Sequence, residues 1–197
     1  RLTLDGGGTM SADTVMLATG MPFLDRGLYF AKLKPLCSYA LAFVDVEPPD
    51  GMYLSAGGPT RSVRDAIGPD GLPLLLIGGN GHVVGRADSE LAQADDLRRW
   101  TQRYFSGAVE THAWSAQDYQ SHDGIPFVGE LPRGGGRIFL ATGYDKWGMT
   151  NAVAAARAVS ARILGDPPSW AAVMGRRLTR PSGALQILSV NATAALS

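Results

Sequence analysis

The chain has 197 residues, and its 18 lysines and arginines balance 18 aspartates and glutamates, so the formal net charge is zero. A balanced charge argues against a protein that binds nucleic acid or is steered to an anionic membrane surface. The length and the 45% of hydrophobic residues suffice for a sizeable core without disulfides or a metal. The single cysteine, Cys37, and the absence of a long apolar run or a secretory leader favour a cytoplasmic protein.

Short apolar runs between glycine and proline turns predict an antiparallel meander of strands in the first half of the chain. The strands are expected at Arg1–Asp5, Ala12–Ala18, Leu36–Val46, Met52–Ala56, Ser62–Ile67 and Leu72–Ile77. The Ala12–Ala18 run is typical of a buried strand inside a sheet. We interpret the glycine-rich segment Gly79–Gly85 as a hairpin turn.

The spacing of apolar residues changes to three and four after this meander, which predicts an amphipathic helix over Asp88–Phe105. Asp88 or Ser89 is suited to cap its start. The apolar residues of this helix are Leu91, Ala94, Leu97, Trp100 and Tyr104. Their position on one face favours a helix that covers one face of the sheet.

The second half of the chain contains a predicted strand, loop and helix in direct succession. Val109–Gln117 alternates as a strand does, and Gly124–Leu131 is rich in turn residues. Arg137–Thr142 reads as a compact buried strand that leads through Gly143–Gly148 into an alanine-rich helix over Met149–Leu164. The following Gly-Asp-Pro-Pro sequence ends that helix.

Several common chemistries lack their motifs in this sequence. The three histidines, His82, His112 and His122, have no spacing typical of a zinc site, so no metal is expected. The sequence contains neither a Gly-x-Ser-x-Gly elbow nor a P-loop. Gly79–Gly85 differs from a dinucleotide fingerprint in the place of its third glycine, and a nicotinamide-binding fold that uses this turn is kept only as a weaker alternative.

The loop Gly143–Gly148 leads into the N-terminus of a helix, where unpaired backbone N–H groups carry a partial positive charge. Such a terminus suits a phosphate, a carboxylate or the electron-rich pyrimidine edge of a flavin. The alternative is a packed turn whose helix is capped by Thr150.

Three passages occur in the order in which they are found in one family of flavoproteins. They are Ala12-Asp-Thr-Val-Met-Leu-Ala-Thr-Gly20, Asp123-Gly-Ile-Pro-Phe-Val-Gly129 and Ala141-Thr-Gly-Tyr-Asp-Lys-Trp-Gly-Met-Thr150. Together with Lys34–Tyr39, this set resembles the C-terminal half of the FAD-dependent D-amino-acid oxidase and sarcosine oxidase superfamily. The Lys-Trp-Gly-Met-Thr form is most similar to the subset that often carries a Rieske iron–sulfur domain.

The resemblance implies an α+β fold of two lobes. A mixed, largely antiparallel substrate-binding sheet with a covering helix is expected over residues 35–131. Residues 1–34 and 132–180 are expected to form the C-terminal part of a Rossmann-like FAD-binding lobe, followed by a tail over 181–197.

The resemblance also implies roles for particular residues. The residues expected to contact the cofactor are Thr19, Gly20, Gly143, Tyr144, Trp147, Gly148, Met149 and Thr150. Tyr39, Arg64 and Asp123 are expected to bind the substrate, although Asp123 equally suits a turn and Trp147 a hydrophobic core. No catalytic residue is assigned, because hydride transfer from an amine to a flavin needs little acid–base help.

The sequence departs from the family pattern at four points. It lacks the Gly-x-Gly-x-x-Gly loop that grips the FAD pyrophosphate, so we expect a fragment that needs an N-terminal half to bind FAD. Ala116 stands where sarcosine oxidases have the cysteine that bonds the flavin, so FAD is expected to be non-covalent. The segment Leu74–His82 lacks the lysine that promotes reaction with oxygen, which leaves the electron acceptor open. One cysteine cannot hold a Rieske cluster.

The function expected from the resemblance is oxidation of the C–N bond of a small amine or amino acid. The alternative, from another class, is a non-catalytic binding module in which the substrate-lobe sheet has become an interaction surface.

Overall fold

The computed structural model describes residues 1–24, 26–87, 89–175 and 188, and it divides into two compact units. The first unit combines Arg1–Lys34 with the chain from Asp118 onward, and the second is Pro35–Gln117. The first boundary coincides with the expected one, whereas the second falls after residue 117 and not after residue 131. The predicted tail over 181–197 lies outside the described residues, apart from Leu188.

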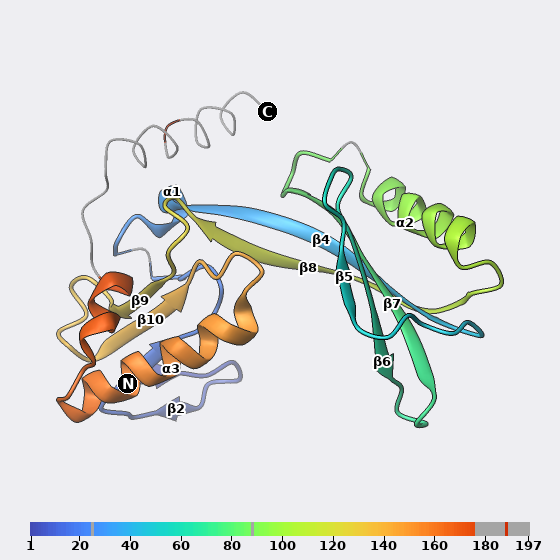
Figure 1. Cartoon of the computed structure of the whole chain (residues 1–197). Helices are drawn as coiled ribbons and strands as arrows, with labels where there is room; N and C mark the ends of the chain where they lie inside the picture. Colours follow the sequence, from blue (N-terminus) through green and yellow to red (C-terminus); the bar gives the residue numbers. More distant parts are fainter. Residues whose placement is uncertain (25, 88, 176–187, 189–197) are drawn as a thin grey trace. The chain divides into compact units, whose positions relative to one another are not determined.

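The first unit is built on a small mixed sheet with the strand order β3-β10-β9 (Figure 1). Its strands are β3 (Val15–Leu17), β9 (Phe127–Glu130) and β10 (Ile138–Thr142). The central strand β10 is parallel to β3 and antiparallel to β9. A separate hairpin of β1 (Leu2–Thr3) and β2 (Thr9–Met10) precedes this sheet.

Both faces of this sheet are covered. Phe139 and Ala141 pack with α3 (Gly148–Leu164) and with Met174 of the 3-10 helix η1 (Ser169–Met174). Leu140, between them in the strand, packs on the other face with a cluster that includes Tyr29 of the short helix α1 (Tyr29–Lys32). This alternation explains why the strand is apolar from Ile138 to Ala141.

The second unit contains a sheet with the strand order β5-β6-β7-β4-β8. The strands are β4 (Leu33–Val44), β5 (Met52–Leu54), β6 (Arg61–Ile67), β7 (Pro73–Val83) and β8 (Val109–Ser121). β5, β6, β7 and β4 pair antiparallel in turn. The predicted α+β fold with a largely antiparallel sheet is confirmed.

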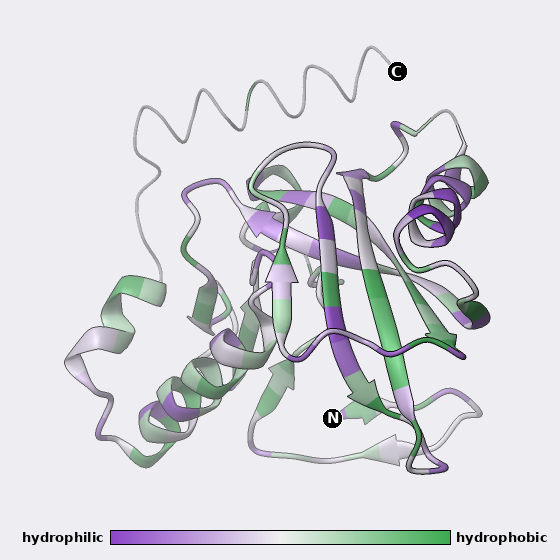
Figure 2. Cartoon of the chain, turned by 45° about the vertical axis from the view of Figure 1, so that its right-hand side comes forward, coloured by the Kyte–Doolittle hydropathy of each residue, from purple (hydrophilic) through white to green (hydrophobic). Residues whose placement is uncertain are grey.

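The helix α2 (Glu90–Tyr104) covers one face of this second sheet (Figures 1 and 2). Its side chain Leu97 is fully buried in a cluster with alternate residues of β4 and β7. Ser89 caps the helix through its hydroxyl oxygen, which accepts a hydrogen bond from the N–H of Ala92 at 3.2 Å. The predicted helix and its cap are therefore confirmed, although Leu91 and Tyr104, both expected on the apolar face, are exposed.

The opposite face of the second sheet is less buried. In β6, Val63 packs against the α2-covered cluster, so its neighbour Arg64 points to the opposite face, where it pairs in register with Leu76. Arg64 is exposed, and Leu76 is half-buried. We call the face that carries Arg64 and Leu76 the open face of the second unit.

Three local predictions were wrong. Gly79–Gly85 is not a hairpin turn, because residues up to Val83 continue β7 and pair with β4. Residues 127–130 form a strand and not a turn-rich passage. Among the described strands β3 lies at the edge of its sheet and not in the interior, and its Met16 is 40% exposed.

Glycine has a specific role in the unexpected extension of β7. A Cβ atom on Gly79 would lie 2.3 Å from the carbonyl oxygen of Thr60, the residue just before the neighbouring strand β6. A Cβ atom on Gly78 would lie 2.5 Å from the Ser62 hydroxyl oxygen. The glycines therefore allow a close approach of two strands. Glycine inside a strand often marks a position where another backbone comes close.

Candidate functional site

Two glycine turns lie side by side in the first unit, because the parallel strands β3 and β10 end at the same edge of the sheet. Thr19 and Gly20 follow β3, and Gly143 follows β10. The hydroxyl group of Thr142 donates a hydrogen bond to the carbonyl oxygen of Gly20 and ties the turns together. The structure therefore brings together residues that are more than 120 positions apart in the sequence.

Both turns need glycine. Gly20 and Gly143 have φ values of +74° and +79°, in the left-handed region that side chains disfavour. A Cβ atom on Gly20 would lie 2.6 Å from the Tyr119 ring, and one on Gly143 would lie 3.2 Å from Leu33 and from Ser121. The glycines thus fit close packing within the first unit.

The segment 143–147, which we call the glycine loop, is held against the end of β8. Tyr144 forms a β-bridge with Gln120, and the N–H of Asp145 donates to the carbonyl oxygen of Tyr119 at 3.1 Å. Asp145 and Lys146 both have left-handed backbones, with φ values of 47° and 66°. Such conformations cost free energy in residues other than glycine and persist only where surrounding contacts fix them.

The glycine loop ends at the N-terminus of α3, whose first residues are Gly148, Met149 and Thr150. Trp147 is the N-cap residue, and no side chain caps the helix, so the alternative of a cap by Thr150 is wrong. Trp147 and Met149 are 68% and 91% exposed. Tryptophan in a hydrophobic core, the other alternative, is therefore also wrong.

The start of α3 thus combines backbone N–H groups that lack helical partners with two exposed apolar side chains. The first turn contains no acidic residue that would neutralise its partial positive charge. These properties fit a flat ring with an electron-rich, polar edge, such as the pyrimidine edge of the isoalloxazine ring of FAD. Tyr144 is half-buried beside them, and burial raises the pKa of its hydroxyl group.

The three residues expected to bind substrate occupy different environments. Tyr39 is buried on the α2-covered face of the second unit, and its hydroxyl group lies 2.9 Å from Nε2 of His82. Burial there raises the pKa of Tyr39 to about 12. Arg64 lies on the open face of the same sheet.

Asp123, the third residue, belongs to the first unit, where its carboxylate serves the local turn. Its Oδ1 atom accepts a hydrogen bond from the N–H of Ile125 at 3.2 Å and lies 3.3 Å from the hydroxyl oxygen of Ser121. This geometry is that of the turn former that the sequence also suggested.

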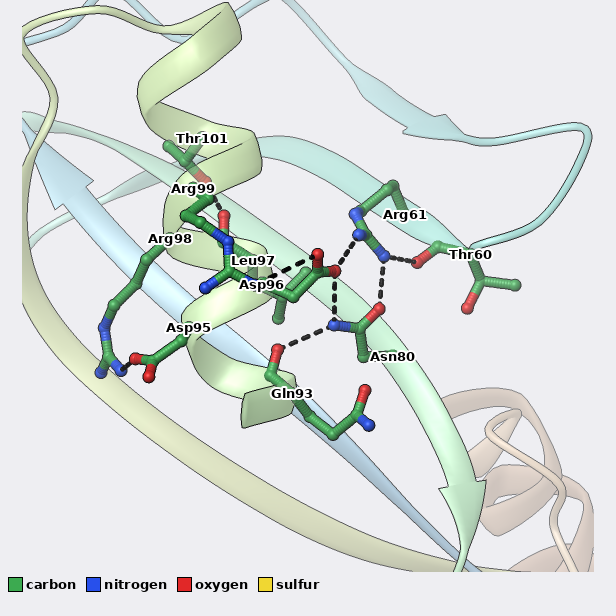
Figure 3. Close-up of polar contacts among 10 residues, drawn as sticks. All are labelled: Thr60, Arg61, Asn80, Gln93, Asp95, Asp96, Leu97, Arg98, Arg99 and Thr101. Atoms are coloured by element: carbon green, nitrogen blue, oxygen red, sulfur yellow. Dashed lines mark hydrogen bonds and ion pairs between the residues drawn. The ribbon is translucent and has the colours of Figure 1, made fainter. Parts of the chain in front are cut away.

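A second arginine of β6, Arg61, has a structural role and connects the strand to α2 (Figure 3). It is 7% exposed and forms an ion pair with Asp96 of α2. It also donates hydrogen bonds to the side-chain oxygen of Asn80 and to the carbonyl oxygen of Thr60. Because these partners engage both terminal nitrogens of its guanidinium group, Arg61 fastens α2 to the sheet, and Arg64 is the arginine of this strand that remains exposed.

One residue at the site was missed in the sequence. Asp118 lies at the end of β8 beside the glycine loop, and burial raises the pKa of its carboxyl group. No signal distinguishes it in the sequence, where it follows an alternating strand in the same way as any surface aspartate.

Comparison with known proteins identifies the family. Residues 2–162 match the model of the FAD-dependent oxidoreductase family known as DAO, and the chain belongs to this family. FAD is the cofactor of the family, which confirms the predicted family and cofactor.

One similar protein has a curated description. It is the Bacillus subtilis protein named "Putative Rieske 2Fe-2S iron-sulfur protein YhfW", which is 33% identical over 148 residues. The match covers 74% of this chain and 29% of that protein. The name agrees with the predicted similarity to the Rieske-associated subset.

Solved structures with the same fold include two oxidases. Glycine oxidase from Geobacillus kaustophilus has a TM-score of 0.63 at 19% identity, with 83% of this chain and 44% of that chain covered. Iminodiacetate oxidase from Chelativorans sp. BNC1 has a TM-score of 0.59 at 11% identity, with 83% and 46% covered. The chain thus spans less than half the length of these proteins.

The described residues contain neither a helix suited to cross a membrane nor a cluster suited to hold a metal ion. None of the helices placed by the structure is long and apolar enough to cross a membrane. Over the same described residues, no group of three or more His, Cys, Asp or Glu side chains is arranged to hold a metal ion.

Proposed function

We propose that this chain is the C-terminal part of an FAD-dependent oxidoreductase that oxidises the C–N bond of a small amine or amino acid. The observation that carries the proposal is the start of α3, where uncapped backbone N–H groups and exposed apolar side chains follow a glycine loop fixed in place. The membership of the FAD-dependent family supports it.

The cofactor would be held by the residues at the two glycine turns and at the start of α3. These are Thr19, Gly20, Gly143, Tyr144, Trp147, Gly148, Met149 and Thr150. When bound, FAD supplies the acceptor for a hydride from the carbon atom next to the substrate nitrogen. The backbone N–H groups of Gly148–Thr150 would stabilise negative charge at the flavin edge, and the apolar side chains of Trp147 and Met149 would exclude water beside them.

Arg64 is the residue proposed to bind the carboxylate of an amino-acid substrate. It is exposed on the open face of the second unit, and its register partner there is an apolar leucine. A guanidinium group binds a carboxylate through two parallel hydrogen bonds. Tyr39 is buried on the other face, so we propose that it supports the sheet and does not itself contact the substrate.

The outer side of α3 supports the proposal that further protein completes the FAD lobe. Val153, Ile163 and Leu164 are more than half exposed, although α3 also packs apolar residues against its own sheet. A helix that is apolar on several sides is normally buried. A dinucleotide-binding half with a glycine-rich phosphate loop, which the 197 residues do not contain, is the partner expected for this surface.

The test is a flavin titration followed by fluorescence, first with the 197 residues alone and then with an N-terminal dinucleotide-binding half supplied. We expect weak or no binding by the chain alone and a yellow protein with both halves. Tight binding of FAD by the chain alone would contradict the proposal that an N-terminal half is needed to bind FAD. A complete protein that binds no flavin would favour the non-catalytic binding module.

A further inference from the structure

Asp118 is a half-buried acidic residue that the proposed reaction does not use. Within the described part of the chain, neither of its carboxylate oxygens has a hydrogen-bond partner, although both are shielded from solvent. An ionised carboxylate in such a place loses hydration that the ammonium group and backbone N–H of Lys146 replace only in part, which disfavours the ionised form. The protonated form avoids most of this cost.

The position of Asp118 connects it to the glycine loop. It directly precedes Tyr119, whose carbonyl oxygen accepts the hydrogen bond from the N–H of Asp145, and Gln120, which forms the β-bridge with Tyr144. The side chain of Gln120 donates a further hydrogen bond to Asp145 Oδ2 at 2.9 Å. The three residues 118–120 thus form the surface against which the loop is held.

Two charged groups of the loop face the Asp118 carboxyl group. Burial is the largest influence and raises its pKa, and the negative charge of Asp145 acts in the same direction. The ammonium group and the backbone N–H of Lys146 act in the opposite direction but do not reverse the increase. The loop therefore brings both an attracting and a repelling group to this carboxyl group.

We propose that Asp118 is a positioning residue for the glycine loop: its protonated carboxyl group lets the loop stay packed against the end of β8, and its ionisation loosens that packing. The inference deepens the proposed function and rests on it, because the glycine loop leads directly into the helix start that would contact FAD. Asp118 touches no reacting atom in this account and is not a catalytic residue.

The sign of the pH dependence follows from the direction of the pKa change. A carboxyl group with a higher pKa in the closed loop than in the open loop favours closure at low pH. This contribution is fully present below the pKa of the open form and is lost as the pH rises through the pKa of the closed form. The Asp118→Asn variant keeps a neutral side chain of the same shape at every pH, so its loop is expected to stay closed.

The experiment measures amide hydrogen exchange of Asp145 and Trp147 by NMR, in the full chain, between pH 4 and pH 8. Both amides donate backbone hydrogen bonds in the closed loop. After correction for the intrinsic rate, protection in the wild type should fall about tenfold for each pH unit between the two pKa values of Asp118. The D118N variant should keep its protection throughout.

Two further variants serve as controls. Asp166→Asn removes an exposed carboxylate at the far end of α3 and should leave the wild-type pH profile unchanged. Lys146→Gln removes the attracting charge and so raises the pKa of Asp118 in the closed loop further. The loss of protection should begin at the same pH as in the wild type but continue to higher pH and become larger in total. The proposal is overturned if D118N follows the wild-type profile, or if it loses protection at low pH as well.

A second readout separates this inference from the proposed function. With the N-terminal half supplied, FAD affinity should weaken with rising pH in the wild type and change less in D118N. If no variant binds FAD at any pH, the proposed function fails, whereas the amide exchange still decides the role of Asp118.

Discussion

The hydroxyl group of Thr142, at the end of β10, donates a hydrogen bond to the carbonyl oxygen of Gly20, in the turn after β3. Thr142 is 2% exposed, so the donor of this bond is buried in the first unit. It joins two Thr-Gly turns that the sequence repeats at positions 19–20 and 142–143. The two turns therefore behave as one structural element of the proposed flavin site.

Loss of this hydrogen bond should destabilise the first unit. In the Thr142→Val variant the Gly20 carbonyl oxygen loses its donor, and we expect the free energy of unfolding to fall by about 1–3 kcal/mol. Urea denaturation measures this change. The Thr142→Ser variant keeps the hydroxyl group and should lose clearly less stability, and equal losses in both variants would argue that packing of the methyl group is the cause.

Glycine at position 143 should be required for both its backbone conformation and its close packing. Gly165 has a similar φ of +88° but nothing within 4 Å of an added Cβ atom, so it is a matched control for Gly143. We expect about 1–2 kcal/mol of destabilisation for Gly165→Ala, from the left-handed backbone alone.

Gly143→Ala should cost more than this, because its Cβ atom would also crowd Leu33 and Ser121. Thermal unfolding of the two variants measures the difference. An equal effect would show that the space around Gly143 adjusts without cost.

The elements of the second half of the chain were predictable because their patterns are local. The buried strand predicted over 137–142, the glycine loop and the alanine-rich helix each reflect contacts within a few residues, and the structure has them nearly where expected. The glycines of β7 were misinterpreted because their cause lies in another strand. Their lack of a side chain makes room for Thr60 and Ser62, which the sequence of β7 does not reveal.

The ion pair between Arg61 and Asp96 should contribute to acid sensitivity. Hydrogen bonding from Asn80 is the largest cause that lowers the pKa of Asp96, and the charge of Arg61 acts with it. A carboxyl group with a lower pKa in the folded state stabilises the protein above its unfolded pKa, and this contribution is lost as the pH falls through the folded pKa.

The test is the free energy of unfolding measured between pH 7 and pH 2. The Asp96→Asn variant should be less stable than the wild type at pH 7, and the difference should shrink toward pH 2. Since Asp96 is 44% exposed, solvent screening keeps the expected loss to about 1–3 kcal/mol. A difference that is constant with pH would contradict an electrostatic role.

Arg64 should affect substrate binding and not stability. Removing a guanidinium group that binds a carboxylate costs about 1.5–3 kcal/mol, which raises the KM for an amino acid by about tenfold to a hundredfold. The Arg64→Gln variant of the complete enzyme should show this increase for amino acids and little change for amines without a carboxylate. Arg103→Gln, at an exposed arginine of α2, is the matched control.

The candidate site was predictable only in part. Sequence spacing shows which residues of a strand share a face, but it does not show which of the two faces another element covers. Tyr39 and Arg64 both fall in strands of the expected lobe, yet the structure buries the first beneath α2 and exposes the second. Arg61 has the same chemistry as Arg64, and only the position of Asp96 and Asn80 shows that it is already paired. Asp118 was missed because its burial results from the loop that packs on it.

The central claim is that the glycine loop and the start of α3 form the flavin-contacting part of an amine oxidoreductase. The most direct measurement is the visible absorption of FAD in the complete protein, recorded without oxygen before and after a small amino acid is added. The account predicts that the absorption band of oxidised flavin disappears on addition, and that it disappears more slowly in the Gly143→Ala variant. A protein that binds FAD but keeps this band with every amine and amino acid tested would contradict the claim.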